Sequence, residues 1–125
     1  MEIHPSKTCG FYTETQVEIA KRAAQIISED SHKHIPISQI AERFSVSETS
    51  LKNYFRGVYG QNISTWLREI RMDTAAELLS NTKRPIAEIS EQVGYSNQGK
   101  FAAVFKKRFG LSPLEYRRLK NLDKS

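Results

Sequence analysis

The chain has 125 residues with 38% hydrophobic and 26% charged side chains, which is typical of one folded domain or two small ones. No run approaches the roughly 18 consecutive apolar residues that a bilayer crossing requires, and the N-terminus lacks the apolar core of a secretory signal, so we expect a cytoplasmic chain. The single cysteine, Cys9, excludes an internal disulfide framework and a cysteine-rich zinc module, so apolar packing must hold the fold together.

Positive charge is concentrated toward the C-terminus. The formal net charge is +5, and it changes from −1 over residues 1–34 to +2 over 35–84 and +4 over 85–125. Such a gradient indicates an anionic partner, with nucleic acid favoured over a membrane surface. Charge alone says nothing about sequence preference.

Apolar residues are spaced as in helices almost throughout, and no segment alternates as a strand would, so we predict an all-α protein. The first helix should begin near Thr13, where two capping-box patterns overlap. Its expected buried residues are Ala20, Ala23, Ala24 and Ile27. Residues 1–11 are expected to form a flexible tail. Residues 31–34 interrupt the helical pattern, and Pro36 suits the first turn of the next helix.

One stretch of the chain recurs further along, and this repeat predicts the fold. Residues 36–47 align with 85–96 at an offset of 49, and after one inserted residue the match resumes at 50. Each copy contains a short helix, a tight turn and a longer helix opened by a capping serine, which is typical of a helix-turn-helix motif. Gly94 suits a left-handed turn, whereas Ser45 in the first copy must adopt that conformation at some cost or turn differently.

Between the copies, residues 63–80 form one continuous helical pattern. The predicted helix would be about 27 Å long. Recognition helices must lie roughly 34 Å apart to enter successive major-groove turns on one face of DNA, and such a stiff helix together with the domain bodies can set that separation. We therefore divide the chain into an N-terminal helix-turn-helix subdomain at 12–61, a linker helix at 62–81, a C-terminal helix-turn-helix subdomain at 82–122 and a tail at 123–125.

The first recognition helix is predicted at 47–58, with Leu51, Phe55 and Val58 facing the core. Its opposite face carries side chains that can hydrogen-bond adenine or guanine, contact thymine methyl groups, or grip phosphates. We assign base contacts on this face to Thr49, Lys52, Asn53 and Arg56. A solvated helix face is the commoner explanation for such a stripe, but its place on the second helix of a helix-turn-helix favours contact with DNA.

The second recognition helix is predicted at 96–109, with a face that is poorer in hydrogen-bonding groups. The positions equivalent to the first stripe are Gly99, Ala102, Ala103 and Lys106. Small residues there allow close backbone approach and contacts with thymine methyl groups. Polar base contacts are then left to Asn97, Gln98 and Lys100 at the start of the helix. We therefore expect the first copy to read bases more stringently than the second.

Basic residues cluster from the last turn of the second recognition helix onward, with one acid, Glu115, among them. Phosphate contacts add affinity and fix the register of a protein on DNA without specifying sequence. We assign phosphate contacts to Ser47, Ser96, Lys106, Lys107, Arg117, Arg118 and Lys120. The alternative is charge that serves solubility alone. If about six phosphates are neutralised, log affinity should fall against log salt with a slope of about −5.

Other patterns do not predict a site. Residues 94–100 have the spacing of a phosphate-binding loop, but Phe101 stands where the loop needs Ser or Thr, and no strand precedes it. His32 and His34 lie in a segment without a nearby cluster of cysteines or carboxylates, which favours a surface linker over a metal site. Arg71 is expected to form a structural ion pair and is assigned no role in DNA binding. No arrangement supports catalysis, and no cofactor is expected.

The chain resembles the C-terminal signature of AraC/XylS-type bacterial transcription regulators over about residues 12–120. The resemblance rests on motifs that include Val93-Gly94-Tyr95, Phe105-Lys106-Lys107, Ser112-Pro113 and Tyr116-Arg117. It implies seven helices, two helix-turn-helix subdomains joined by a long helix, and insertion of both recognition helices into adjacent major-groove segments. By position it places base contacts on Thr49, Lys52, Asn53, Asn97, Gln98 and Ala103. Ala103 departs from the large polar residue that is often found there.

The leading interpretation is a sequence-specific transcription regulator, an activator by family analogy. It would bind an asymmetric double-stranded DNA operator as a monomer, because one chain supplies both recognition helices. The analogy also suggests RNA polymerase as a partner. Members of the family commonly carry a separate effector-sensing domain, for which this chain has no room. We favour the DNA-binding part of a longer regulator over a short stand-alone member, because the tail before Tyr12 resembles a linker. The alternative function is a helical protein-interaction module whose basic face binds an acidic partner.

Overall fold

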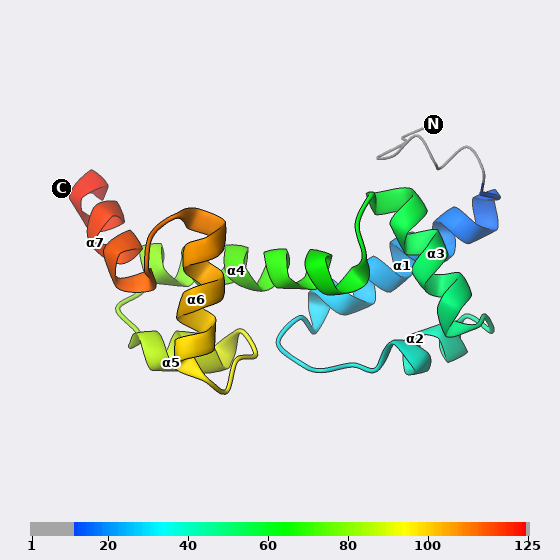
Figure 1. Ribbon diagram of the computed structural model, residues 1–125, viewed down its shortest axis with the longest axis horizontal. Coiled ribbons are helices and arrows are strands. Elements are labelled where there is room, and N and C mark those ends of the chain that lie inside the picture. The colour runs from blue at the N-terminus through cyan, green and yellow to red at the C-terminus, as the bar shows by residue number, and fades with distance from the viewer. Residues whose placement is uncertain (1–11, 125) are drawn as a thin grey trace. The chain divides into compact units, whose positions relative to one another are not determined.

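The computed structural model describes residues 12–124, which form seven helices and no strand (Figure 1). The helices are α1 (Glu14–Glu29), α2 (Ile37–Arg43), α3 (Glu48–Tyr59), α4 (Ile63–Asn81), α5 (Ile86–Gln92), α6 (Gln98–Phe109) and α7 (Pro113–Lys124). The prediction of an all-α fold is confirmed. The expected tail at 1–11 lies outside the described residues, as does Ser125. Within 12–124, no helix is both long enough and apolar enough to span a membrane.

The described residues fall into two compact units. Residues 12–30 and 34–67 form the first unit, and residues 31–33 with 68–124 form the second. The helix α4 is continuous, so it begins in one unit and ends in the other. This division explains why its apolar residues serve two separate cores: Ile63 packs in the first, whereas Met72 and Leu79 are fully buried in the second.

In the first unit, α3 packs against both α1 and α2. The helix α1 begins after Thr13, whose hydroxyl accepts a hydrogen bond from the Gln16 N–H at 3.1 Å while the Gln16 side chain accepts one from the Thr13 N–H at 3.0 Å. This is the predicted capping box. The four predicted core residues of α1, Ala20, Ala23, Ala24 and Ile27, are all buried.

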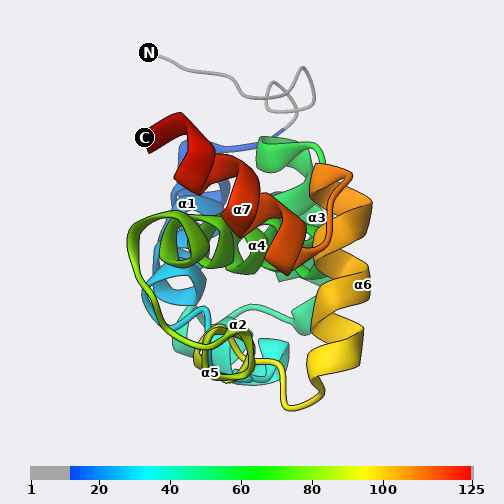
Figure 2. The ribbon, with the colours of Figure 1, turned by 90° about the vertical axis from the view of Figure 1, so that its left-hand side faces the viewer.

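In the second unit, α6 takes the place of α3 and packs against α5 and α7 (Figure 2). Phe101 and Phe105 are fully buried, as predicted, while Val104 and Phe109 are partly buried against the same core. Each unit also contains three rings in mutual contact, with centroids 4.6 to 5.7 Å apart in the first and 4.6 to 5.4 Å apart in the second. These rings are Phe55, Tyr59 and Trp66, and then Phe105, Phe109 and Tyr116.

The repeat extends further than the sequence pattern indicated. The buried residues of α1 recur in α4 at an offset of 52, where they are Met72, Ala75, Ala76 and Leu79. Each unit therefore consists of a helix-turn-helix and the helix that precedes it, α1 or α4, which packs in the same core. Only the two central alanine pairs are identical, while Met72 and Leu79 stand where α1 has Ala20 and Ile27, so this part of the repeat is hard to recognise in the sequence.

Each of the two turns contains one residue with a positive φ. Ser45 has a φ of 56° and Gly94 a φ of 101°, so the serine does adopt the left-handed region that it enters only at some cost. The recognition helix of the first copy is capped by Ser47, as predicted. The prediction of a serine cap in the second copy is wrong: α6 begins at Gln98, and Asn97 caps it in place of Ser96.

Candidate nucleic-acid interface

The helix α3 presents one apolar face and one polar face. Leu51, Phe55 and Val58 are completely buried. The four side chains assigned to base contacts all lie on the exposed side: Thr49, Lys52, Asn53 and Arg56. The 3.6-residue period of the helix therefore separates the side chains that hold the unit together from those that can meet a partner.

Three of the four polar side chains on this face are uncommitted. Within residues 12–124, the side chains of Thr49, Asn53 and Arg56 make no hydrogen bond or ion pair. Lys52 differs, because its Nζ lies 3.0 Å from the Oε2 of Glu48, one helical turn earlier. Both side chains are about half exposed, at 57% and 46%, so this pair is open to exchange with another ligand. The pairing of Lys52 with Glu48 was not predicted, although their i, i+4 spacing is visible in the sequence.

The start of α6 brings together the polar residues assigned to the second copy. Asn97, Gln98 and Lys100 are all exposed. The Asn97 Oδ1 accepts a hydrogen bond from the Lys100 N–H at 2.9 Å, which leaves both amide N–H groups of Asn97 free to donate to a partner. Ala103 is exposed further along the helix. The two recognition helices therefore differ in where their polar side chains lie: α3 carries them along its length, whereas α6 carries them in its first turn.

The basic residues at the C-terminal end of α6 and on α7 divide into two groups. Lys106, Lys107 and Arg118 are exposed and make no ion pair within the described ranges. Arg108, Arg117 and Lys120 are engaged within the unit. The Arg108 guanidinium donates to Asp73 Oδ1 at 2.7 and 3.1 Å, and the Lys120 Nζ lies 5.4 Å from the centroid of the Tyr116 ring.

Arg117 is the clearest departure from a solvated cation. It is half-buried, and its Nε and Nη2 donate to the carbonyl oxygens of Leu79 at 3.1 Å and Thr82 at 3.3 Å. These carbonyls lie at and just beyond the last turn of α4, whose own last turn carries no basic residue. Cations at a helix C-terminus stabilise its unpaired carbonyls. Arg117 therefore caps α4.

Glu115, the acid among these cations, is held within its own helix. Its Oε1 accepts a hydrogen bond from the Ser112 N–H at 2.8 Å, while the Ser112 hydroxyl accepts one from the Glu115 N–H at 3.1 Å. The hydrogen bond from the Ser112 backbone lowers the pKa of the Glu115 carboxyl, with smaller contributions that include the charges of Lys106 and Arg118. The carboxylate is thus used to start α7.

The expectation that Arg71 forms an ion pair is wrong, because its partners are backbone carbonyls. The side chain does act structurally, but it donates to the backbone carbonyls of Ser31 and Lys33 instead of a carboxylate. His32 and His34 are exposed. Within residues 12–124, no group of three or more histidines, cysteines and acidic residues is placed to hold a metal ion.

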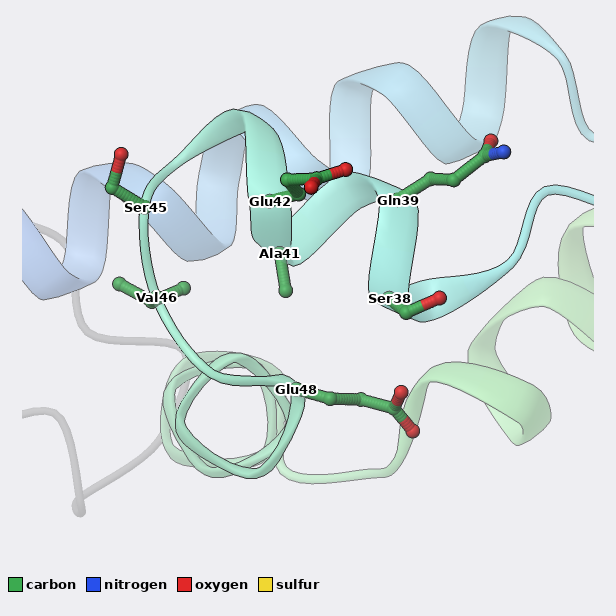
Figure 3. Close-up of a pocket in the computed structure, with 7 residues that line it drawn as sticks. All are labelled: Ser38, Gln39, Ala41, Glu42, Ser45, Val46 and Glu48. Carbon is green, nitrogen blue, oxygen red and sulfur yellow. The ribbon is translucent and has the colours of Figure 1, made fainter.

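A hollow beside the first helix-turn-helix has the wrong charge for a phosphate. It is lined by Ser38, Gln39, Ala41, Glu42, Ser45, Val46 and Glu48 (Figure 3). Its two charged side chains, Glu42 and Glu48, are both acidic, and they would repel a nucleotide or a DNA backbone. The exposed face of α3 is thus the better candidate for contact with nucleic acid.

Comparison with known proteins identifies the relatives of this chain. The profile of a helix-turn-helix domain family matches residues 40–119. The arabinose operon regulatory protein of Salmonella typhimurium is 36% identical over 96 residues, which cover 76% of this chain and 34% of that protein. The virulence regulon transcriptional activator VirF of Yersinia enterocolitica is 31% identical over 97 residues, covering 78% and 36%.

A solved structure agrees with these sequence matches. The C-terminal domain of AraT, a response regulator from Geobacillus stearothermophilus, superposes with a TM-score of 0.75 at 40% identity, covering 81% of this chain and 84% of that one. The chain spans about a third of the length of the arabinose regulator that it matches. On the combined evidence of the profile, the relatives and the shared fold, the chain belongs to the AraC/XylS family of transcription regulators.

Proposed function

We propose that this chain is the DNA-binding part of a transcription regulator, and that α3 and α6 each insert into a segment of the major groove of double-stranded DNA. The observation that carries the proposal is the exposed face of α3, where Thr49, Asn53 and Arg56 are uncommitted in the described structure while the opposite face is fully buried. A polar helix face of this kind on the second helix of a helix-turn-helix matches the groove-reading geometry of such motifs.

The proposed base contacts follow from the donors and acceptors that remain available. In the first copy, Asn53 pairs with adenine and Arg56 or Lys52 with guanine, with Thr49 against thymine. In the second copy, the polar contacts come from Gln98 and Lys100, joined by the amide N–H groups of Asn97, and Ala103 contacts a thymine methyl group.

The proposed set of phosphate-contacting residues is smaller than the set predicted from the sequence. We retain Ser47, Ser96, Lys106, Lys107, Arg118 and Lys120, and we leave out Arg117 because its guanidinium already binds two carbonyls. The retained set contains four cations, which are Lys106, Lys107, Arg118 and Lys120. If these four charges neutralise phosphates, log affinity should fall against log salt with a slope of about −3.6.

The proposed role in the cell is activation of transcription, with RNA polymerase as the protein partner. The name of VirF, a transcriptional activator, supports this direction of regulation. Because one chain supplies both readers, the DNA-binding unit would act as a monomer on an asymmetric site. A regulator of bacterial genes would work in the cytoplasm, and we assign the chain no reaction of its own.

The experiment that tests the proposal is selection of bound duplexes from a random pool at a fixed salt concentration, followed by footprinting. We expect an asymmetric site of about two helical turns, because each reader occupies one major-groove segment. Asn53→Ala should relax discrimination at its own base positions more than Gln98→Ala does at the others. A protein-interaction module predicts no enrichment and no footprint, and that result would refute the proposal.

A further inference from the structure

Arg71 connects three parts of the second unit. It lies half-buried on α4, and its Nε donates to the carbonyl oxygen of Ser31 at 2.6 Å while its Nη2 donates to that of Lys33 at 3.3 Å. Its guanidinium carbon also lies 5.7 Å from the centroid of the Tyr95 ring. Tyr95 belongs to the turn between α5 and α6. One side chain therefore holds residues 31–33 and the turn of the second helix-turn-helix together.

Gly94, in the same turn, is exposed but leaves no room for a side chain. A Cβ atom built on this glycine would lie 2.9 Å from the carbonyl oxygen of His32 and 3.1 Å from the Arg71 Cζ. Both separations are shorter than ordinary van der Waals contact, and the φ of 101° is itself unfavourable for other residues. The His32 backbone and the Arg71 side chain therefore contact the turn directly at Gly94.

The turn transmits this restraint to the recognition helix. The Tyr95 carbonyl accepts a hydrogen bond from the Ser90 hydroxyl at 3.1 Å, and Ser90 is 1% exposed. The Tyr95 ring contacts the ring of Phe101, with 5.9 Å between centroids, and Phe101 is completely buried in α6. Displacement of Tyr95 would therefore shift the start of α6, where Gln98 stands.

The first unit fills the equivalent positions with apolar residues. At the offset of 52 between α4 and α1, Arg71 corresponds to Ile19, and at the offset of 49 between the turns, Tyr95 corresponds to Val46. Both Ile19 and Val46 pack against the first core. An aliphatic side chain is thus sufficient for packing at this place in the fold, so the guanidinium serves another purpose in the second copy.

We propose that Arg71 is a positioning residue for the second recognition helix, which it orients through Tyr95 without touching DNA. The inference rests on the proposed function and extends it, because it names a residue that sets specificity from outside the contact face. A planar guanidinium can bind two carbonyls and stack on a ring at the same time, which neither an aliphatic chain nor an ammonium can do.

The test compares Arg71→Ile, which copies the first unit, with Arg71→Lys, which retains the charge. Base preferences of the full chain are measured across the whole selected site, with positions of the second reader defined by Gln98→Ala. We expect Arg71→Ile to lose roughly tenfold discrimination at those positions and none at the positions of Asn53, with Arg71→Lys restoring little of it. An equal loss at both sets of positions would identify a merely structural role and overturn the proposal.

Two further measurements separate the alternatives. A residue that contacts phosphate would change the salt slope by about 0.9 on replacement, so an unchanged slope is expected here and a change of that size would overturn the proposal. Amide hydrogen exchange in the DNA-free chain should accelerate over 93–100 in Arg71→Ile and stay unchanged in α3. Unchanged exchange over 93–100 would refute the positioning role even if no DNA site were found, whereas absence of selected DNA with accelerated exchange would refute only the proposed function.

Discussion

Replacing Arg117 with alanine is expected to destabilise the chain, whereas replacing its neighbour Arg118 is expected to weaken DNA binding. The two residues carry the same charge on the same helix. Arg117 is half-buried and donates to the carbonyls of Leu79 and Thr82, while Arg118 is exposed without an ion pair inside residues 12–124. The pair therefore separates a structural cation from one free to meet phosphate.

The magnitudes follow from these environments. Hydrogen bonds to charged groups contribute about 1.5–3 kcal/mol, and the two bonds of Arg117 share one partly solvated guanidinium, so we expect Arg117→Ala to cost about 2 kcal/mol. Arg118→Ala should change the free energy of unfolding by less than about 0.5 kcal/mol, as is usual for surface substitutions. Loss of one phosphate contact should reduce the steepness of the salt slope by about 0.9.

Both variants are measured by urea unfolding and by fluorescence anisotropy with a selected duplex at several salt concentrations. Arg117→Ala should have a lower free energy of unfolding than the parent, and Arg118→Ala should have a shallower salt slope than the parent. Arg117→Ala is expected to keep the parental slope wherever it is folded. If Arg117→Ala instead changed the slope and left stability intact, its guanidinium would be a DNA contact and our interpretation of the α4 cap would be wrong.

Three further predictions concern other parts of the chain. Glu48→Gln should release Lys52 from its exposed pair, so DNA affinity should rise with a steeper salt slope and less than about 0.5 kcal/mol change in stability; an unaltered slope in anisotropy titrations would count against this. Phe55→Ala should cost about 3–5 kcal/mol in urea unfolding because the ring is completely buried, and a loss under about 1 kcal/mol would contradict that packing. Because the Ser112 N–H lowers the pKa of Glu115, its carboxylate stabilises the fold above the unfolded pKa, and this contribution is lost as pH falls through the folded pKa. Thermal unfolding of Glu115→Gln and the parent should therefore differ most at neutral pH and converge in acid, and a difference independent of pH would oppose it.

The helices and their buried faces were predictable because each depends on local periodicity. Leu51 and Phe55 recur at the helical spacing, and both are completely buried. Thr13 and Ser47 are good N-caps that precede apolar-periodic runs, and both cap helices. In these places the hydrophobic pattern, the capping residue and the tertiary contacts agree.

The cap of α6 was missed because two good capping residues are adjacent. Serine and asparagine cap helices about equally well, so side-chain chemistry does not separate Ser96 from Asn97. The offset between the copies does separate them. The recognition helices align at 50, which carries Ser47 onto Asn97, so the inserted residue precedes the cap instead of following it.

The charge pattern could not predict which basic side chains bind within the fold and which stay exposed, because a run of basic residues does not show which side chain turns inward. Comparison of the two copies supplies the missing signal. At the offset of 50, Arg117 corresponds to Leu67, which packs against the first core, whereas Arg118 corresponds to Arg68, which is exposed. Arg71 follows the same rule, because its counterpart is apolar. A charged residue that replaces a packed apolar one in a repeat occupies a place already facing the interior, so its charge must be satisfied by the fold before it can serve a partner.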